Sequence, residues 1–129
     1  MLAIDTNIVV RLLTGDDLEQ TQRARALIET AEIYVTTTVV LETAWVLRGA
    51  YGKSASQIVA ALRAFAGLPT VTLEDGPRVH AALTWVASGM DIADALHLAG
   101  CADCEAFVTF DRHLLKSAKP LAGVTVQEP

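Results

Sequence analysis

The stretch that decides the fold lies near the start of the chain and reads Leu2-Ala3-Ile4-Asp5-Thr6-Asn7. Three apolar residues in a row, closed by polar ones, are typical of a short strand that is buried on both faces. From about residue 6 to residue 13 the pattern becomes helical, and Gly15-Asp16-Asp17 ends it. A buried strand followed directly by a helix is the first half of a parallel βαβ unit.

The same alternation continues along the chain. Further strands are expected at four short apolar runs, residues 33–35, 71–73, 107–108 and 124–126. Helices are expected between them, because apolar residues recur there at helical spacing, as at Ala24, Leu27 and Ile28. We therefore predict an α/β fold with one central parallel sheet of four to five strands and helices on both faces. The 129 residues suit a single domain over residues 1–129.

Composition excludes several classes of protein. Hydrophobic residues make up 52% of the chain, which indicates a globular protein and excludes a disordered one. No apolar run approaches the roughly 18 residues that a membrane helix needs, and no charged start precedes an apolar run. Two cysteines, Cys101 and Cys104, are too few for a disulfide framework. We expect a cytoplasmic protein that does not enter a membrane.

Four acidic residues stand where a carboxylate needs a partner. Asp5 and Asp111 follow the first and fourth expected strands, so both can lie at the carboxyl edge of the sheet, where sites form in parallel folds. Glu42 and Asp94 lie on helices that are otherwise largely apolar, and a carboxylate there is costly to bury unless it is paired or bound to metal. Asp91 lies three residues before Asp94, on the same side of its helix.

Each acid also has a simpler interpretation. Asp5, Asp91 and Asp111 can be the N-caps of the helices that follow them. Glu42 can lie on a solvated stripe, and Asp94 can pair with an arginine or occupy an exposed first turn. These interpretations do not explain why four acids are placed so that they can converge. Two carboxylates about 4 Å apart repel by roughly 4 kcal/mol at an effective dielectric constant of 20, so a converging set needs protons or a counter-cation.

A metal site of this kind predicts a substrate. Carboxylate oxygens are hard ligands, so the expected cation is Mg²⁺ or Mn²⁺. Such an ion polarises a phosphoryl oxygen and activates water, which makes a phosphodiester the natural substrate. The net charge of −5 argues against nucleic-acid binding, but without the four acids the remaining charges nearly balance. Weak, salt-sensitive RNA binding can then use the basic residues Arg11, Arg48, Lys53, Arg112, Lys116 and Lys119.

Four blocks around the acids carry a family resemblance. They are residues 2–8, residues 42–52 (beginning Glu42-Thr43-Ala44-Trp45), residues 91–99 and residues 107–111, in this order. Together they resemble PIN-domain ribonucleases, especially the toxins of the VapC kind in bacterial toxin–antitoxin pairs. In the third block that family usually has an aromatic residue where this chain has Ile92, a departure that affects packing more than chemistry.

The resemblance implies a metal site formed by Asp5, Glu42, Asp94 and Asp111. It also implies that Thr109 orients a water or a carboxylate, that Asn7 supports the end of the first strand, and that Asp91 is an outer acid. The implied enzyme is an Mg²⁺- or Mn²⁺-dependent endoribonuclease that cuts RNA to leave 5′-phosphate and 3′-hydroxyl ends. The implied partners are a second copy of the chain, giving a homodimer, and a cognate antitoxin whose tail lies across the acidic cleft.

Other interpretations stay open at this point. A haloacid-dehalogenase-type phosphatase also starts with an aspartate after a strand, but its chemistry needs a second aspartate where this chain has Asn7. The acids can instead form a non-catalytic module that grips a basic tail, or the domain can belong to RNA processing or DNA repair and not to a toxin pair. Cys101 and Cys104 have no further clustered ligands for zinc, and Trp45 and Trp85 are expected in the core.

Overall fold

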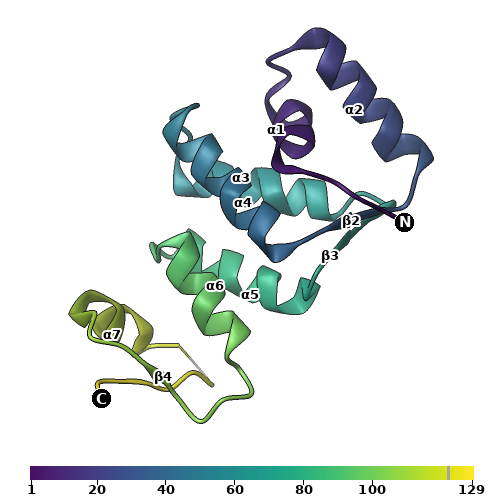
Figure 1. The fold of residues 1–129 in the computed structure, drawn as a ribbon. Coiled ribbons are helices and arrows are strands. Elements are labelled where there is room, and N and C mark those ends of the chain that lie inside the picture. The colour runs from purple at the N-terminus through teal and green to yellow at the C-terminus, as the bar shows by residue number, and fades with distance from the viewer. Residues whose placement is uncertain (122) are drawn as a thin grey trace.

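The computed structural model describes residues 1–121 and 123–129 (Figure 1). Strands and helices follow one another as β1 (Leu2–Ala3), α1 (Thr6–Thr14), α2 (Leu18–Thr30), β2 (Ile33–Val35), α3 (Thr37–Gly49), α4 (Ala55–Ala66), β3 (Val71–Leu73), α5 (Gly76–Ala87), α6 (Ile92–Gly100), β4 (Phe107–Val108), α7 (Arg112–Ala118) and β5 (Val126–Gln127). The predicted α/β class is therefore confirmed. In the described part of the chain, no helix is both long and apolar enough to cross a membrane.

Polar side chains set where the helices begin. The Asp17 carboxylate accepts a hydrogen bond of 2.9 Å from the backbone N–H of Gln20 and caps α2. At the start of α4, Ser54 and Gln57 bond reciprocally to each other's backbone N–H groups and form a capping box. The first helix ends at Gly15, whose φ of 64° is a left-handed conformation that glycine adopts without strain. These local signals explain why the sequence patterns locate the helices well.

The strands form two separate sheets. In the first sheet β1, β2 and β3 pair in parallel in that order, with Leu2 opposite Ile33 and Ile33 opposite Val71. In the second, β4 and β5 pair in parallel, with Phe107 opposite Val126. All five expected strands are present, but the expected central sheet of four to five strands is not found among the described residues. The sheet is divided into three strands and two.

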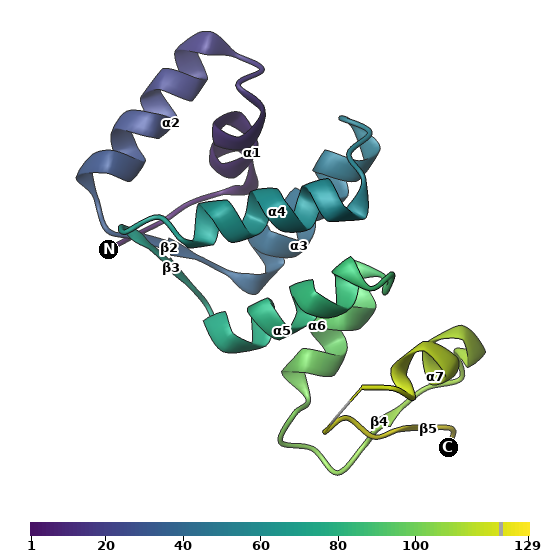
Figure 2. The same cartoon turned by 180° about the vertical axis from the view of Figure 1, so that it is seen from behind.

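Two hydrophobic clusters explain this division. The larger cluster joins α1 to α6 with the three-stranded sheet, and Ile33, Leu83 and Ala95 are fully buried in it. The smaller cluster is built on Leu98, Leu114 and Ala118 and holds the second sheet and α7 against α6. Trp85 and Met90 pack against both clusters. Figures 1 and 2 show β4, α7 and β5 beyond α6, on the far side from α1 and α2. The C-terminal unit, residues 107–121 and 123–129, therefore has its own small core.

Candidate active site

Two of the four predicted site acids lie in one electrostatic neighbourhood. Asp94 stands half-buried in the first turn of α6, and Asp111 is the exposed N-cap of α7. Burial raises the pKa of Asp94, and the negative charges of Asp91 and Asp111 raise it further. The nearby His97 and His113 oppose this shift. The fold thus gathers Asp91, Asp94 and Asp111 closely enough that their charges interact.

Asp91 caps α6, as its simpler interpretation predicted. Its Oδ2 atom accepts hydrogen bonds from the backbone N–H groups of Ala93 (3.0 Å) and Asp94 (3.2 Å). Its Oδ1 atom lies 3.7 Å from a guanidinium nitrogen of Arg48, which comes from α3. The aspartate therefore fixes the first turn of α6, on which Asp94 stands, and lies beside Arg48 of α3.

Thr109 and Asp111 form a local turn at the carboxyl end of β4. The Asp111 Oδ1 atom accepts hydrogen bonds from the backbone N–H groups of His113 (2.9 Å) and Leu114 (3.1 Å). The Thr109 hydroxyl accepts a bond of 3.0 Å from the backbone N–H of Asp111. Thr109 therefore holds the backbone of Asp111, which is compatible with the predicted role of orienting a carboxylate. Within the described chain the second carboxylate oxygen of Asp111 receives no hydrogen bond.

Asp5 and Glu42 lie at the start of α1 and on α3, which the larger cluster joins to α6. Asp5 is the N-cap of α1, and its Oδ1 atom accepts a bond of 2.8 Å from the backbone N–H of Thr6. Glu42 is exposed on α3 and forms no hydrogen bond or ion pair with any described residue. Asn7 is exposed in the first turn of α1, close in sequence to Asp5. Asp5 and Glu42 both come after strands of the three-stranded sheet in the sequence, since α1 follows β1 and α3 follows β2.

The four acids are not assembled into one metal centre here. Among residues 1–121 and 123–129, no group of three or more His, Cys, Asp or Glu side chains is placed to hold a metal ion. The chemistry of the donors nevertheless fits a divalent cation, because oxygen ligands suit Mg²⁺ and the charge crowding at Asp94 would be relieved by one. The four-residue metal site therefore stays a prediction.

Two exposed aromatic residues lie next to predicted site acids in the sequence, and one of them corrects a sequence prediction. Trp45 was expected in the core, but 46% of its surface is exposed. It lies on α3, one helical turn after Glu42. Phe110, which directly precedes Asp111, is 83% exposed. Since α3 is apolar over most of its surface, its sequence pattern does not decide which face is buried. Trp85 is partly buried against both clusters, as predicted.

A comparison with known protein families covers most of the chain. The family model described as "PIN domain" matches residues 2–120, which include all four predicted acids. No curated protein matches the chain.

Proposed function

The chain belongs to the PIN domain family, and from that premise we propose that it is a metal-dependent endoribonuclease, the toxin of a toxin–antitoxin pair. PIN domains are generally metal-dependent nucleases, which supports a hydrolase acting on nucleic acid. The observation that carries the proposal is the gathering of Asp94, Asp91 and Asp111 at the start of α6 and α7. A shared negative charge of this kind is what a cation-dependent phosphodiesterase requires.

In the proposed enzyme, Asp5, Glu42, Asp94 and Asp111 hold Mg²⁺ or Mn²⁺. The ion, when bound, polarises the phosphoryl oxygens and lowers the pKa of a coordinated water. Asp91 fixes the first turn of α6 and so positions Asp94, and Thr109 positions Asp111 through its backbone. Water attacks the phosphorus in line with the leaving 3′ oxygen, and the products carry 5′-phosphate and 3′-hydroxyl ends.

The free edges of the two sheets suggest how the four acids come together. Leu2 and Ile4 donate their N–H groups to β2, so the N–H and C=O of Ala3 face the open edge of β1. Phe107 and Thr109 donate theirs toward β5, so the peptide groups of Val108 face the open edge of β4. We propose that these edges pair in parallel in the active enzyme. Asp5 and Asp111, which follow the two strands, would then lie at one edge of a five-stranded sheet.

The exposure of the two edges supports this pairing. Leu2 is 51% exposed on β1, and Val108 is 52% exposed on β4. Open strand edges with apolar side chains are usually covered in native proteins, because they otherwise template association. The covering strand can come from the same chain or from a second copy, and the proposed homodimer allows the second route.

Cleavage of a labelled single-stranded RNA by the purified protein tests the enzyme proposal. We expect cleavage with Mg²⁺ or Mn²⁺, none with EDTA, and none with Asp94→Asn or Asp111→Asn. Asp17→Asn is the matched control for Asp111→Asn, since both residues are N-caps and Asp17 stands at the start of α2. Asparagine caps helices as well as aspartate, so these two variants should fold. Asp94 is not a cap, and Asp94→Asn removes a charge that burial and neighbouring acids disfavour, so it should fold as well. Wild-type cleavage by Asp94→Asn would refute the assignment.

The toxin assignment and its partners rest on the resemblance of the sequence blocks, and they need their own test. Expression of the wild-type chain should arrest bacterial growth, and Asp94→Asn should not. A cognate antitoxin should bind the purified toxin and suppress cleavage, and light scattering should give the mass of a homodimer. Cleavage in vitro without growth arrest would favour a PIN nuclease of RNA processing. Binding of a basic peptide without cleavage would favour the non-catalytic module.

A further inference from the structure

A groove lies between α1 and α2. Asp5 is the N-cap of α1. The volume of the groove is about 560 Å³. Its lining includes Asn7, Ile8 and Arg11 from α1 and Gln20, Arg23 and Leu27 from α2. Two of these residues are cations, two carry amide donors, two are apolar, and no residue of the lining is acidic. This combination suits a ligand with an anionic group and a less polar body.

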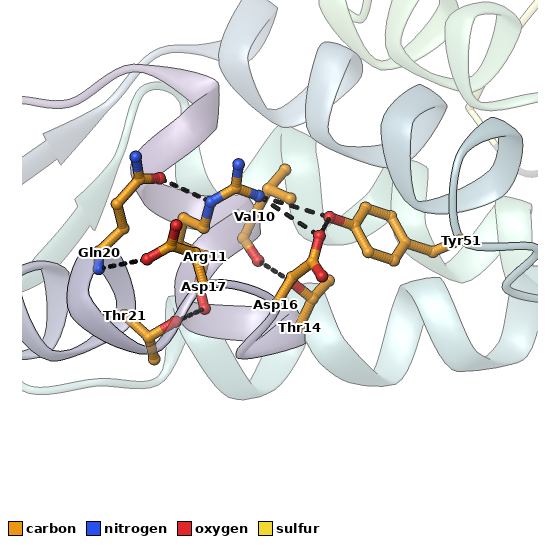
Figure 3. A network of polar contacts seen from close by, with 8 residues as sticks. All are labelled: Val10, Arg11, Thr14, Asp16, Asp17, Gln20, Thr21 and Tyr51. Atoms are coloured by element: carbon orange, nitrogen blue, oxygen red, sulfur yellow. Dashed lines mark hydrogen bonds and ion pairs between the residues drawn. The ribbon is translucent and has the colours of Figure 1, made fainter.

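Arg11 is held in one orientation inside the groove (Figure 3). Its Nε atom donates to the side-chain oxygen of Gln20 at 2.7 Å, and one Nη atom lies 3.4 Å from the Tyr51 hydroxyl. The same Nη atom is 3.8 Å from an Asp16 carboxylate oxygen, whose side chain is 54% exposed. The remaining nitrogen points away from these partners, and no described residue accepts a hydrogen bond from it. A fixed guanidinium with an unused donor is prepared for an oxyanion.

Arg23 supplies a second positive charge, and its contacts contribute little to the stability of the fold. Its side chain is 78% exposed, and its one ion pair, with Glu19 on the same helix, is 3.9 Å long. Exposed pairs of this length contribute little, so Arg23 can turn to a ligand at small cost. It follows Gln20 by three residues and therefore lies on the same side of α2 as the amide that holds Arg11.

From this arrangement we infer that the groove binds the phosphate and ribose of a nucleotide next to the one at which the RNA is cut. Arg11 and Arg23 hold the phosphate, and Ile8 and Leu27 contact the sugar. Arg11 follows Asp5 by six residues, which is about 9 Å along α1, so the groove lies close to the proposed metal site. No described aromatic residue lines the groove, so it offers no stacking platform for a base. The identity of the substrate as RNA rests on the proposed function.

A salt series of RNA binding tests the inference without requiring catalysis. The protein is titrated into a fluorescein-labelled single-stranded RNA in EDTA, and anisotropy gives the affinity at each salt concentration. Arg23→Gln should lower the slope of log K against log salt by about 0.7, the value for one phosphate contact on a single strand. Arg25→Gln is the matched control, because it removes an exposed arginine of the same helix that is outside the lining. Its slope should stay at the wild-type value.

Arg11→Lys gives a second, independent variant. It keeps the charge and loses the planar fork, so it should raise KM for RNA several-fold while leaving kcat unchanged. Equal salt slopes for Arg23→Gln and Arg25→Gln would overturn the inference. It would also be overturned if Arg23→Gln weakened binding of a labelled poly-aspartate peptide but not of RNA, because the groove would then serve an acidic protein partner.

The result separates this inference from the proposed enzyme. A reduced slope in Arg23→Gln without metal-dependent cleavage by the wild type would support the groove and refute the nuclease. Metal-dependent cleavage with unchanged slopes would support the nuclease and refute the groove.

Discussion

Truncation of Leu114 should detach the half of the candidate site that carries Asp111. Leu114 is 3% exposed and lies in the small cluster that joins α7 to α6. Leu114→Ala loses roughly 2.4 kcal/mol of apolar transfer free energy at about 0.8 kcal/mol per buried methylene. The cavity that remains raises the cost to about 3–5 kcal/mol. A cluster with so few members has little other burial to offset this loss, so we expect local opening of the C-terminal unit.

Amide hydrogen exchange measures this opening directly. The N–H groups of Phe107 and Thr109 bond to β5 at 2.8 and 3.0 Å, and that of Leu115 bonds to Asp111 at 3.0 Å. Because each 1.4 kcal/mol is tenfold, these amides should exchange about 100-fold faster or more in Leu114→Ala. Amides of the three-stranded sheet should keep their wild-type rates, and RNA cleavage should fall because Asp111 no longer stays near Asp94.

Leu62→Ala is the control for this prediction. Leu62 is 4% exposed in the larger cluster, so the substitution is chemically identical and similarly buried. It should speed exchange in α1 to α5 and the three-stranded sheet. If Leu114→Ala instead accelerated exchange evenly along the whole chain, the two clusters would be one cooperative unit and the reasoning would fail.

Substitutions at three further positions test the electrostatics of Asp94, the cap of α6 and the hydrogen bond of Tyr51. Burial and neighbouring acids raise the pKa of Asp94, so folding disfavours its charged form and the free energy of unfolding is lowered. This destabilisation is complete at pH values above the raised pKa. It disappears at pH values below the ordinary pKa of aspartate. Asp94→Asn should therefore raise the Tm of metal-free protein at pH 7, by a margin that shrinks as the pH falls, and a lower Tm would contradict this. Asp91→Ala should cost about 1 kcal/mol in urea unfolding through loss of the α6 cap, whereas Asp91→Asn should leave stability nearly unchanged. Tyr51→Phe should cost about 0.5–1.5 kcal/mol, because it removes the 2.5 Å hydrogen bond to Asp16, and an unchanged unfolding midpoint would count against that bond.

Local structure was predictable because its signals are local. The expected strands at residues 33–35 and 71–73 match β2 and β3 in both position and length. Gly15-Asp16-Asp17 separates α1 from α2 as expected, since Gly15 adopts a left-handed conformation and Asp17 caps the next helix. The last strand begins two residues later than expected, at Val126.

Strand pairing was not predictable in the same way. β1 and β4 have two residues each, so neither carries an alternation that identifies a partner. Which edges meet depends on long-range packing, here on whether α7 is held by α6 through Leu98 and Leu114. The sequence therefore indicates five strands and four notable acids, but it does not indicate that the strands divide into three and two.

The cap and ligand interpretations of the acids are not alternatives. Asp5 and Asp111 each use Oδ1 to cap a helix, and a carboxylate has a second oxygen that the cap does not need. The cap fixes the torsion angles of the side chain, and the helix N-terminus stabilises its negative charge. A carboxylate held in this way loses little further entropy when it binds a cation, so the cap prepares the ligand. Glu42 has no such bond among the described residues, so in the proposed metal site it is the one of these three acids that no cap holds in place.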